Sequence, residues 1–171
     1  MLPIALDLSR LTIVLVGTAE GLAKRQDQLL RQGATDLHVF SYPDFPSDEL
    51  LERTKLILGV DLDEHGNARL ADVAKHHNII LNIEDVMEHC DFHYASFMQR
   101  GDLFISVNTS GKSPTLTTRI KNYLAQIFDE KWEGRLNEIA QQRLSWRSQG
   151  LDYKQVIQKS NAYIDERGWL S

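Results

Sequence analysis

The sequence predicts an α/β fold in its first half, built on a parallel sheet. Short runs of β-branched and aliphatic residues alternate with helical stretches as far as Glu84. These runs are apolar almost throughout, without polar residues at every second position. Strands that are apolar on both faces are typical of parallel sheets covered by helices on both sides. The expected fold class is therefore α/β, with a shortened, open sheet of the Rossmann type.

Four apolar runs are expected to form the strands, with three helical stretches between them. Gly33 is suited to the left-handed turn that follows a helix, and Ser47 is suited to capping a helix at its amino end. A helix between successive strands makes those strands parallel. The expected strands are LTIVLVG at 11–17, DLHVFS at 36–41, KLILGVD at 55–61 and NIILNIED at 78–85, and the expected helices lie in 20–33, 46–54 and 66–77.

The pattern changes at residue 85. HYASFMQ and LFISVNT flank the tripeptide RGD, with Gly101 at a tight turn, and so predict a β-hairpin. A two-stranded hairpin leaves two unpaired edges, which favour contact with a partner chain or with the chain's own helices. Both outcomes are open, and pairing with a second copy would make a homodimer.

The remaining residues are expected to be helical. Ser113 followed by Pro114 is a strong helix start, because serine caps the amino end and proline is tolerated in the first turn. Leu116 and Ile120 follow at helical spacing, and amphipathic patterns continue to the end of the sequence. The predicted division is a Rossmann-like domain at 1–84, a dimerisation hairpin region at 85–110 and a helical domain at 111–171.

Composition is that of an ordinary globular protein and excludes several classes. Of 171 residues, 42% are hydrophobic and 25% are charged, and the formal net charge is -5. An acidic chain repels phosphates, so no nucleic-acid partner is expected. No apolar run approaches the roughly 20 residues that span a bilayer, so no membrane partner is expected. One cysteine cannot form an internal disulfide and no secretion signal is recognisable, so the cytoplasm is the expected compartment.

The turn after the first strand has an incomplete dinucleotide fingerprint. In G-x-G-x-x-G, the glycines allow a tight turn, contact with the diphosphate and close packing of the helix. Here only Gly17 keeps its place, while Ala19 and Leu22 replace the other two and Gly21 lies one position early. The second strand ends in Ser41 and not in the acidic residue that would bind a ribose. A dinucleotide site and a plain strand–turn–helix are both open alternatives.

Downstream motifs are more specific. The segment from Asn82 to Pro114 combines N-x-x-D, Cys-Asp-Phe, Arg-Gly-Asp-Leu and Gly-Lys-Ser-Pro in this order. With Leu2-Pro3, Val16-Gly17 and Gly33-Ala34, these motifs make the sequence similar to the precorrin-2 dehydrogenase / sirohydrochlorin ferrochelatase family, the amino-terminal module of siroheme synthases. The resemblance covers residues 2–128. It implies an NAD-binding domain, a hairpin region that forms an intertwined homodimer, and a helical domain that closes the cleft.

The family oxidises precorrin-2 to sirohydrochlorin with NAD, and some members insert Fe(II) or Co(II) into the product. The resemblance implies that Asp85 is the acid/base in both reactions, since each removes protons from the macrocycle. Without the resemblance, an aspartate that follows a strand is more typical of a cap on the next helix. For a substrate rich in carboxylates, the helix start at Ser113 and the neighbouring Lys112 are expected contacts, and Arg100, Arg119 and Lys121 are further candidates.

The resemblance also implies two sets of binding residues. The NAD contacts would be Gly17, Glu20, Gly21, Ser41, Tyr42 and Pro43, and the substrate contacts would be Asn82, Thr109, Ser110, Gly111, Lys112 and Ser113.

Three departures from the family pattern keep other functions open. The glycine fingerprint is incomplete, residues 42–54 form a shorter segment than usual, and the hairpin lacks its usual proline. The alternatives are an NAD-independent sirohydrochlorin chelatase and a non-catalytic tetrapyrrole-binding or partner subunit. His89 and His93 are four apart, but they align with the entry to a strand, so no fixed metal site is expected. If the chain is a chelatase, Fe(II) or Co(II) is expected as a substrate and not as a resident metal.

Overall fold

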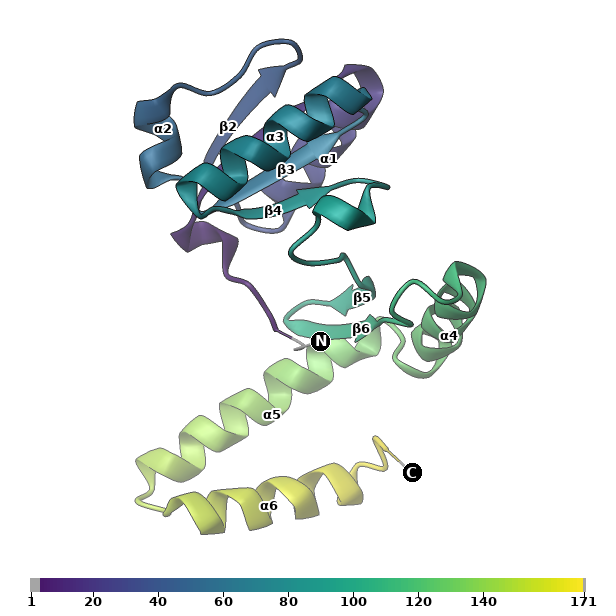
Figure 1. The fold of residues 1–171 in the computed structure, drawn as a ribbon. Coiled ribbons are helices and arrows are strands. Elements are labelled where there is room, and N and C mark those ends of the chain that lie inside the picture. The colour runs from purple at the N-terminus through teal and green to yellow at the C-terminus, as the bar shows by residue number, and fades with distance from the viewer. Residues whose placement is uncertain (1–3, 171) are drawn as a thin grey trace. The chain divides into compact units, whose positions relative to one another are not determined.

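The computed structural model describes residues 4–170 and divides into two compact units, one as far as His93 and one from Tyr94 onward (Figure 1). The predicted hairpin falls in the second unit, together with the helices that follow it. Leu2-Pro3, which contributes to the family resemblance, lies outside the described residues. None of the helices formed by residues 4–170 has the length and hydrophobicity of a membrane-spanning segment.

The first unit contains a parallel four-stranded sheet in the order β2-β1-β3-β4 (Figure 1). Successive strands are joined by helices, so the α/β prediction of a Rossmann-like fold is confirmed. The chain order reverses between β1 and β3, because β2 pairs with one side of β1 while β3 and β4 extend the sheet on the other. The strands are β1 (Thr12–Gly17), β2 (Asp36–Ser41), β3 (Leu56–Val60) and β4 (Ile80–Ile83).

Helices cover both faces of this sheet. Ile13 and Leu15 of β1 pack with Leu22 and Leu29 on one face, while the intervening Val14 and Val16 pack with helical residues on the other. Alternating side chains of one strand therefore enter two different cores, which explains why the strand is apolar throughout. The first face is covered by α1 (Ala19–Arg31), and the second by α2 (Asp48–Arg53) and α3 (Glu64–His77).

The helix ends largely agree with the residues that predict them. Gly33 has φ +91°, and the Ala34 amide donates to the Leu29 carbonyl at 3.0 Å, which is the Schellman arrangement after α1. Ser47 is the N-cap of α2, although its side chain makes no capping bond. The third helix begins earlier than predicted, because the Asp63 side chain accepts from the Gly66 amide at 2.7 Å and caps it.

The second unit is a hairpin followed by three helices. Gly101, with φ +55°, makes the turn of the antiparallel pair, as predicted. The hairpin packs against the first two helices, and the last two helices pack together, with the Tyr163 hydroxyl donating to Glu138 at 2.6 Å. Its described residues include only two buried apolar side chains, those of Met98 and Val156. The elements are β5 (Ser96–Arg100), β6 (Leu103–Val107), α4 (Pro114–Ile127), α5 (Lys131–Ser148) and α6 (Tyr153–Glu166).

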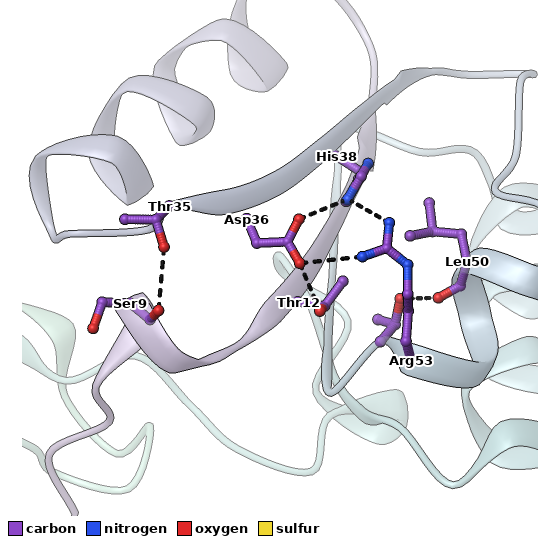
Figure 2. A network of polar contacts seen from close by, with 8 residues as sticks. Ser9, Thr12, Thr35, Asp36, His38, Leu50 and Arg53 are labelled. Carbon is purple, nitrogen blue, oxygen red and sulfur yellow. Dashed lines mark hydrogen bonds and ion pairs between the residues drawn. The ribbon is translucent and has the colours of Figure 1, made fainter.

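A polar network ties the edge strand β2 to the rest of the first unit at the amino ends of the strands (Figure 2). The Thr12 hydroxyl donates to Asp36 Oδ2 at 2.7 Å, and His38 Nε2 lies 2.9 Å from Asp36 Oδ1. Arg53, at the end of α2, lies 3.4 Å from Asp36 Oδ2. The Thr12 hydrogen bond is the main cause that lowers the pKa of Asp36, and His38 and Arg53 lower it further.

This lowered pKa predicts a stability change in acid. A carboxylate whose pKa is lower in the folded state stabilises the fold above its unfolded value, near 3.8, and this contribution is lost as the pH falls through the folded value. Thr12→Val is expected to raise the Asp36 pKa measured by NMR titration. Thr35→Val is the control, because the Thr35 hydroxyl donates to the Ser9 carbonyl and not to Asp36. An equal shift in both variants would contradict the assignment.

Two glycines at opposite ends of α5 give a matched test of backbone conformation. A Cβ would meet nothing within 4 Å at either Gly134 or Gly150, but Gly150 has φ +84° and Gly134 is helical. Gly134→Ala should stabilise the second unit by about 0.5–1 kcal/mol, and Gly150→Ala should destabilise it by about 1 kcal/mol. Urea unfolding followed by tryptophan fluorescence reports this unit, because all three tryptophans lie in it. Shifts of the same sign in both variants would disprove the explanation.

Candidate functional site

The carboxyl ends of the four parallel strands lie at one edge of the sheet. Gly17, at the end of β1, is paired with Ser41 on one side and with Val60 on the other. Open α/β sheets bind ligands at this edge, where the chain order reverses. The reversal lies between β1 and β3, and the loop after β4 carries Asp85 at the same edge. The fold thus brings together the predicted residues of three strand ends.

The turn at Gly17 is tight and tied to the end of β3. A Cβ at Gly17 would lie 2.6 Å from the Val60 carbonyl oxygen, so this position must be glycine. The Thr18 amide donates to the same oxygen at 3.3 Å, and the Thr18 hydroxyl donates to the Asp61 carbonyl at 2.8 Å. Ala19 has φ +47°, a left-handed conformation that favours glycine. Gly17, the first glycine of the fingerprint, therefore allows the tight turn, as expected. Ala19 takes the place of the second glycine in a backbone conformation that is strained for alanine.

Gly21 lies beneath a side chain that the sequence analysis did not single out. A Cβ at Gly21 would clash with Asp61 Oδ2 and lie 2.8 Å from Asp61 Cγ. Asp61 follows β3 with φ +51°, and its carboxylate therefore rests against the first turn of α1. Glu20 is a second acidic residue in that turn. The only sequence signal for Asp61 is its place at the end of an apolar run.

Part of this turn is suited to a dinucleotide and part of it is not. The tight turn and the amides at the start of α1 fit a diphosphate, which Rossmann-type folds hold at this helix end. The open face of Gly21 also fits a close ligand, but the Asp61 carboxylate lies there. The backbone of the turn therefore leaves room for a diphosphate, whereas the Asp61 carboxylate lies against Gly21 in the same place.

At the end of β2 lie three of the expected NAD contacts, Ser41, Tyr42 and Pro43, and the Tyr42 side chain turns away from the strand end. The Tyr42 amide donates to the Gly17 carbonyl at 2.9 Å, which extends the β1–β2 pairing. The Tyr42 ring packs over Gly66, where a Cβ would lie 3.0 Å from the ring. Burial, and then a hydrogen bond with Asp63, raise the pKa of Tyr42. Its side chain is thus held at the start of α3, while Ser41 is exposed and Pro43 follows through a cis peptide bond.

Asp85 presents an exposed carboxylate at the sheet edge. It has φ +63°, and among the described residues its side chain makes no hydrogen bond or ion pair. The next helical element is a short 3₁₀ turn, η2 (Met87–His89), whose N-cap is Val86. The alternative that Asp85 caps a following helix is therefore wrong. The preceding Glu84 pairs with Arg25 of α1 at 2.9 Å.

Asn82 holds the loop that carries Asp85. Its side chain is only 7% exposed, and its amide donates to the Phe92 carbonyl at 2.8 Å and towards Cys90 Sγ at 3.4 Å. Leu81 and Asp91 close the same loop, since the Leu81 amide donates to Asp91 Oδ2 at 2.9 Å. The Asn82 side-chain amide donates only to this loop. Its role within the first unit is therefore to hold the loop that carries Asp85 in place.

The other predicted substrate residues are contiguous in the second unit, just before α4. Ser113 Oγ accepts from the Leu116 amide at 3.2 Å, and Thr109 Oγ1 lies 2.9 Å from Thr117 Oγ1. These two hydroxyls fix the start of the helix. Ser110 and Gly111 take positive φ values of +53° and +75°, and they are exposed together with Lys112.

Several other predicted groups are less suited to bind a ligand. Arg100 pairs with Glu130 at 3.2 Å. His89 ends η2 and His93 lies in the loop beyond, and the described residues contain no cluster of three or more potential metal ligands. A groove of about 510 Å³ runs along α3 and β4, lined by residues that include Lys75, Ile80, His89 and Asp91, but none of the expected NAD or substrate contacts lines it.

Comparison with known proteins agrees with this fold. A family model described as "Putative NAD(P)-binding" matches residues 4–96. Siroheme synthase 1 of Serratia proteamaculans is 25% identical over 177 residues, covering 85% of this chain and 37% of that protein. The siroheme synthase of Methylococcus capsulatus is 27% identical over 156 residues, covering 81% of this chain and 33% of that protein. The chain thus spans only 37% and 33% of the lengths of these two relatives.

A solved structure titled "SirC, precorrin-2 dehydrogenase" matches with a TM-score of 0.74 and 20% identity, covering 100% of this chain and 93% of that one. This likeness concerns the fold and extends over both units. The family model covers more than half of the chain, and the resemblance to the precorrin-2 dehydrogenase family is confirmed. The chain belongs to the family described as "Putative NAD(P)-binding".

Proposed function

We propose that the chain is a precorrin-2 dehydrogenase-type enzyme of siroheme biosynthesis, which oxidises precorrin-2 to sirohydrochlorin. The observation that carries the proposal is the exposed Asp85 carboxylate, held at the carboxyl edge of a Rossmann-like sheet. The siroheme synthases among its relatives support the substrate class, since their names describe tetrapyrrole synthesis.

The reaction removes a hydride and a proton from the macrocycle, giving sirohydrochlorin, NADH and a proton. NAD held at the turn after β1 would supply the hydride acceptor. Asp85 accepts the proton, because its carboxylate is exposed and has no other partner among the described residues. Asn82 keeps the loop beneath Asp85 closed, which fixes where the acceptor stands.

We assign the cofactor contacts to the first unit and most of the substrate contacts to the second. Gly17, Glu20 and Gly21 would hold the cofactor through the turn and the start of α1, and Ser41 to Pro43 would do so through their backbone at the end of β2. Gly111 presents its amide and Lys112 its cation just before α4, a position that favours substrate carboxylates. The Ser110 and Lys112 amides are already used in the turn, since they donate to Asn108 Oδ1 at 2.6 Å and to the Thr109 carbonyl at 3.1 Å. Thr109 and Ser113 shape this turn through their hydroxyls.

A second candidate is an NAD-independent chelatase that inserts Fe(II) or Co(II), as substrate, into sirohydrochlorin and releases two protons. The observation that favours it is the strained turn at Ala19, which weakens the cofactor site without touching Asp85. Asp85 would accept pyrrole protons in this reaction.

The chain forms a homodimer through its second unit. Two buried apolar side chains make a small core for this unit, while many large apolar side chains are exposed. The outer edges of β5 and β6 are unpaired within the described residues, and unpaired edges favour association. The exposed apolar residues of this unit include Phe104, Leu116, Ile120, Tyr123, Ile127 and Leu144.

Asp85→Asn is expected to lower the rate of sirohydrochlorin formation by about 10²-fold or more, because the amide cannot accept the proton. The measurement is a single turnover of precorrin-2 with excess NAD, followed by absorbance. Glu88→Gln is the matched control, since Glu88 is an exposed acid on the same loop.

Unchanged turnover in Asp85→Asn would exclude this role. If the parent chain forms no sirohydrochlorin but inserts Fe(II) or Co(II) without NAD, the chelatase is the correct function. If it only binds the tetrapyrrole, and Asp85→Asn binds it equally, the chain is a non-catalytic subunit.

Phe104→Asp is expected to shift the chain from dimer to monomer. Phe104 is 51% exposed on the hairpin and stacks on Phe97 with ring centroids 4.9 Å apart, so a charge there opposes an apolar contact. Light scattering measures the mass. Leu30→Asp, at an equally exposed leucine of the first unit, should leave the mass unchanged. A monomeric parent chain would refute the dimer.

A further inference from the structure

We propose that Asp61 is a built-in competitor of the cofactor diphosphate, so that its charge sets how weakly this chain binds NAD. The inference rests on the proposed function only in taking NAD as the ligand. It concerns a residue that lies outside the incomplete glycine fingerprint and that the proposed chemistry does not use.

The position of Asp61 is fixed by the turn itself. Its carbonyl accepts the Thr18 hydroxyl at 2.8 Å, and the preceding Val60 carbonyl accepts the Thr18 amide at 3.3 Å. These two bonds join the end of β3 to the turn between β1 and α1. Asp61 therefore belongs to the same rigid edge as Gly17, which pairs with Val60 in the sheet.

The side chain of Asp61 uses the space that Gly21 leaves open. A Cβ at Gly21 would clash with Asp61 Oδ2, lie 2.8 Å from Asp61 Cγ and lie 2.9 Å from Val60 Cγ1. Any larger residue at position 21 would push the carboxylate away. In the usual fingerprint, the absence of a side chain in this turn allows close approach of a ligand. In this chain, the absence of a side chain at Gly21 allows close approach of the Asp61 carboxylate.

The charge of that anion opposes the ligand. The amino end of a helix attracts negative groups, and Asp61 already lies against the first turn of α1, which also carries the acidic Glu20. A diphosphate brings further negative charge to the same place. Since like charges a few ångström apart near a protein surface repel appreciably, removing one carboxylate should change the binding constant by about tenfold.

The obstacle is a side chain and not the backbone. Asp61 is exposed, so its carboxylate can rotate away when a diphosphate arrives. The turn, the helix end and the sheet edge stay as they are. The Asp61 carboxylate therefore weakens NAD binding without blocking it. Removing the charge of this one residue should strengthen the binding.

Asp61→Asn is the direct test, because asparagine keeps the shape and removes the charge. Titration calorimetry with NAD, on the full chain at low salt, should show a dissociation constant about tenfold lower than that of the parent chain. The gain should shrink at high salt, because screening weakens the repulsion. Asp72→Asn is the control, since Asp72 is an exposed acid on α3 and changes the net charge equally. Circular dichroism checks that each variant is folded.

The proposal is overturned if Asp61→Asn binds NAD no more tightly than the parent chain, if neither chain binds measurably, or if Asp72→Asn gains as much. Its outcome is separate from that of the proposed function. Tighter NAD binding in folded Asp61→Asn supports the competitor role even where no sirohydrochlorin forms, and turnover that depends on Asp85 supports the function even where Asp61→Asn changes nothing.

Discussion

The pairing of β1 with both of its neighbours is the constraint on which the first unit depends. Gly17 is in register with Ser41 and with Val60, so three strands end at the same level. There is no room for a side chain at this point, because a Cβ would lie 2.6 Å from the Val60 oxygen. A larger residue would force the strands apart, and the α1 turn, Asp61 and the loop after β4 would lose their common edge. The common level of these strand ends thus depends on the absence of a side chain at Gly17.

The loop after β4 shows how an exposed acid can still have a defined position. Asp85 has no partner of its own among the described residues, yet the residues below it are tightly bonded. Asn82 is buried, and its amide is satisfied by the Phe92 carbonyl only while the loop is closed. Opening the loop would leave a buried polar group unpaired, which is costly. The acid is therefore positioned by interactions that leave its carboxylate exposed to solvent.

Much of this arrangement can be predicted from the sequence because it follows from local patterns. Apolar runs predict the four strands, Gly33 and Gly101 predict two turns, and Ser113 predicts the start of α4. Other features depend on where a side chain turns in space. Asp63 starts α3 earlier than its apolar pattern, and Tyr42 packs over Gly66 instead of facing the sheet edge. Asp61 matches no motif at all, since its meaning depends on a left-handed backbone and on the bare face of a residue 40 positions earlier.

The residues that make this chain similar to its family are mostly not the residues that would contact the cofactor. The family model matches residues 4–96, most of which build the strands, the helices and the two cores between them. A fold maintained by that many contacts tolerates changes at a few edge positions without losing its likeness to relatives. Cofactor affinity depends on those few positions, because the diphosphate meets only a turn and a helix end. Ala19, with its left-handed backbone, and Asp61, which lies against Gly21, are at positions of this kind. The fold alone therefore does not determine how strongly this chain binds NAD.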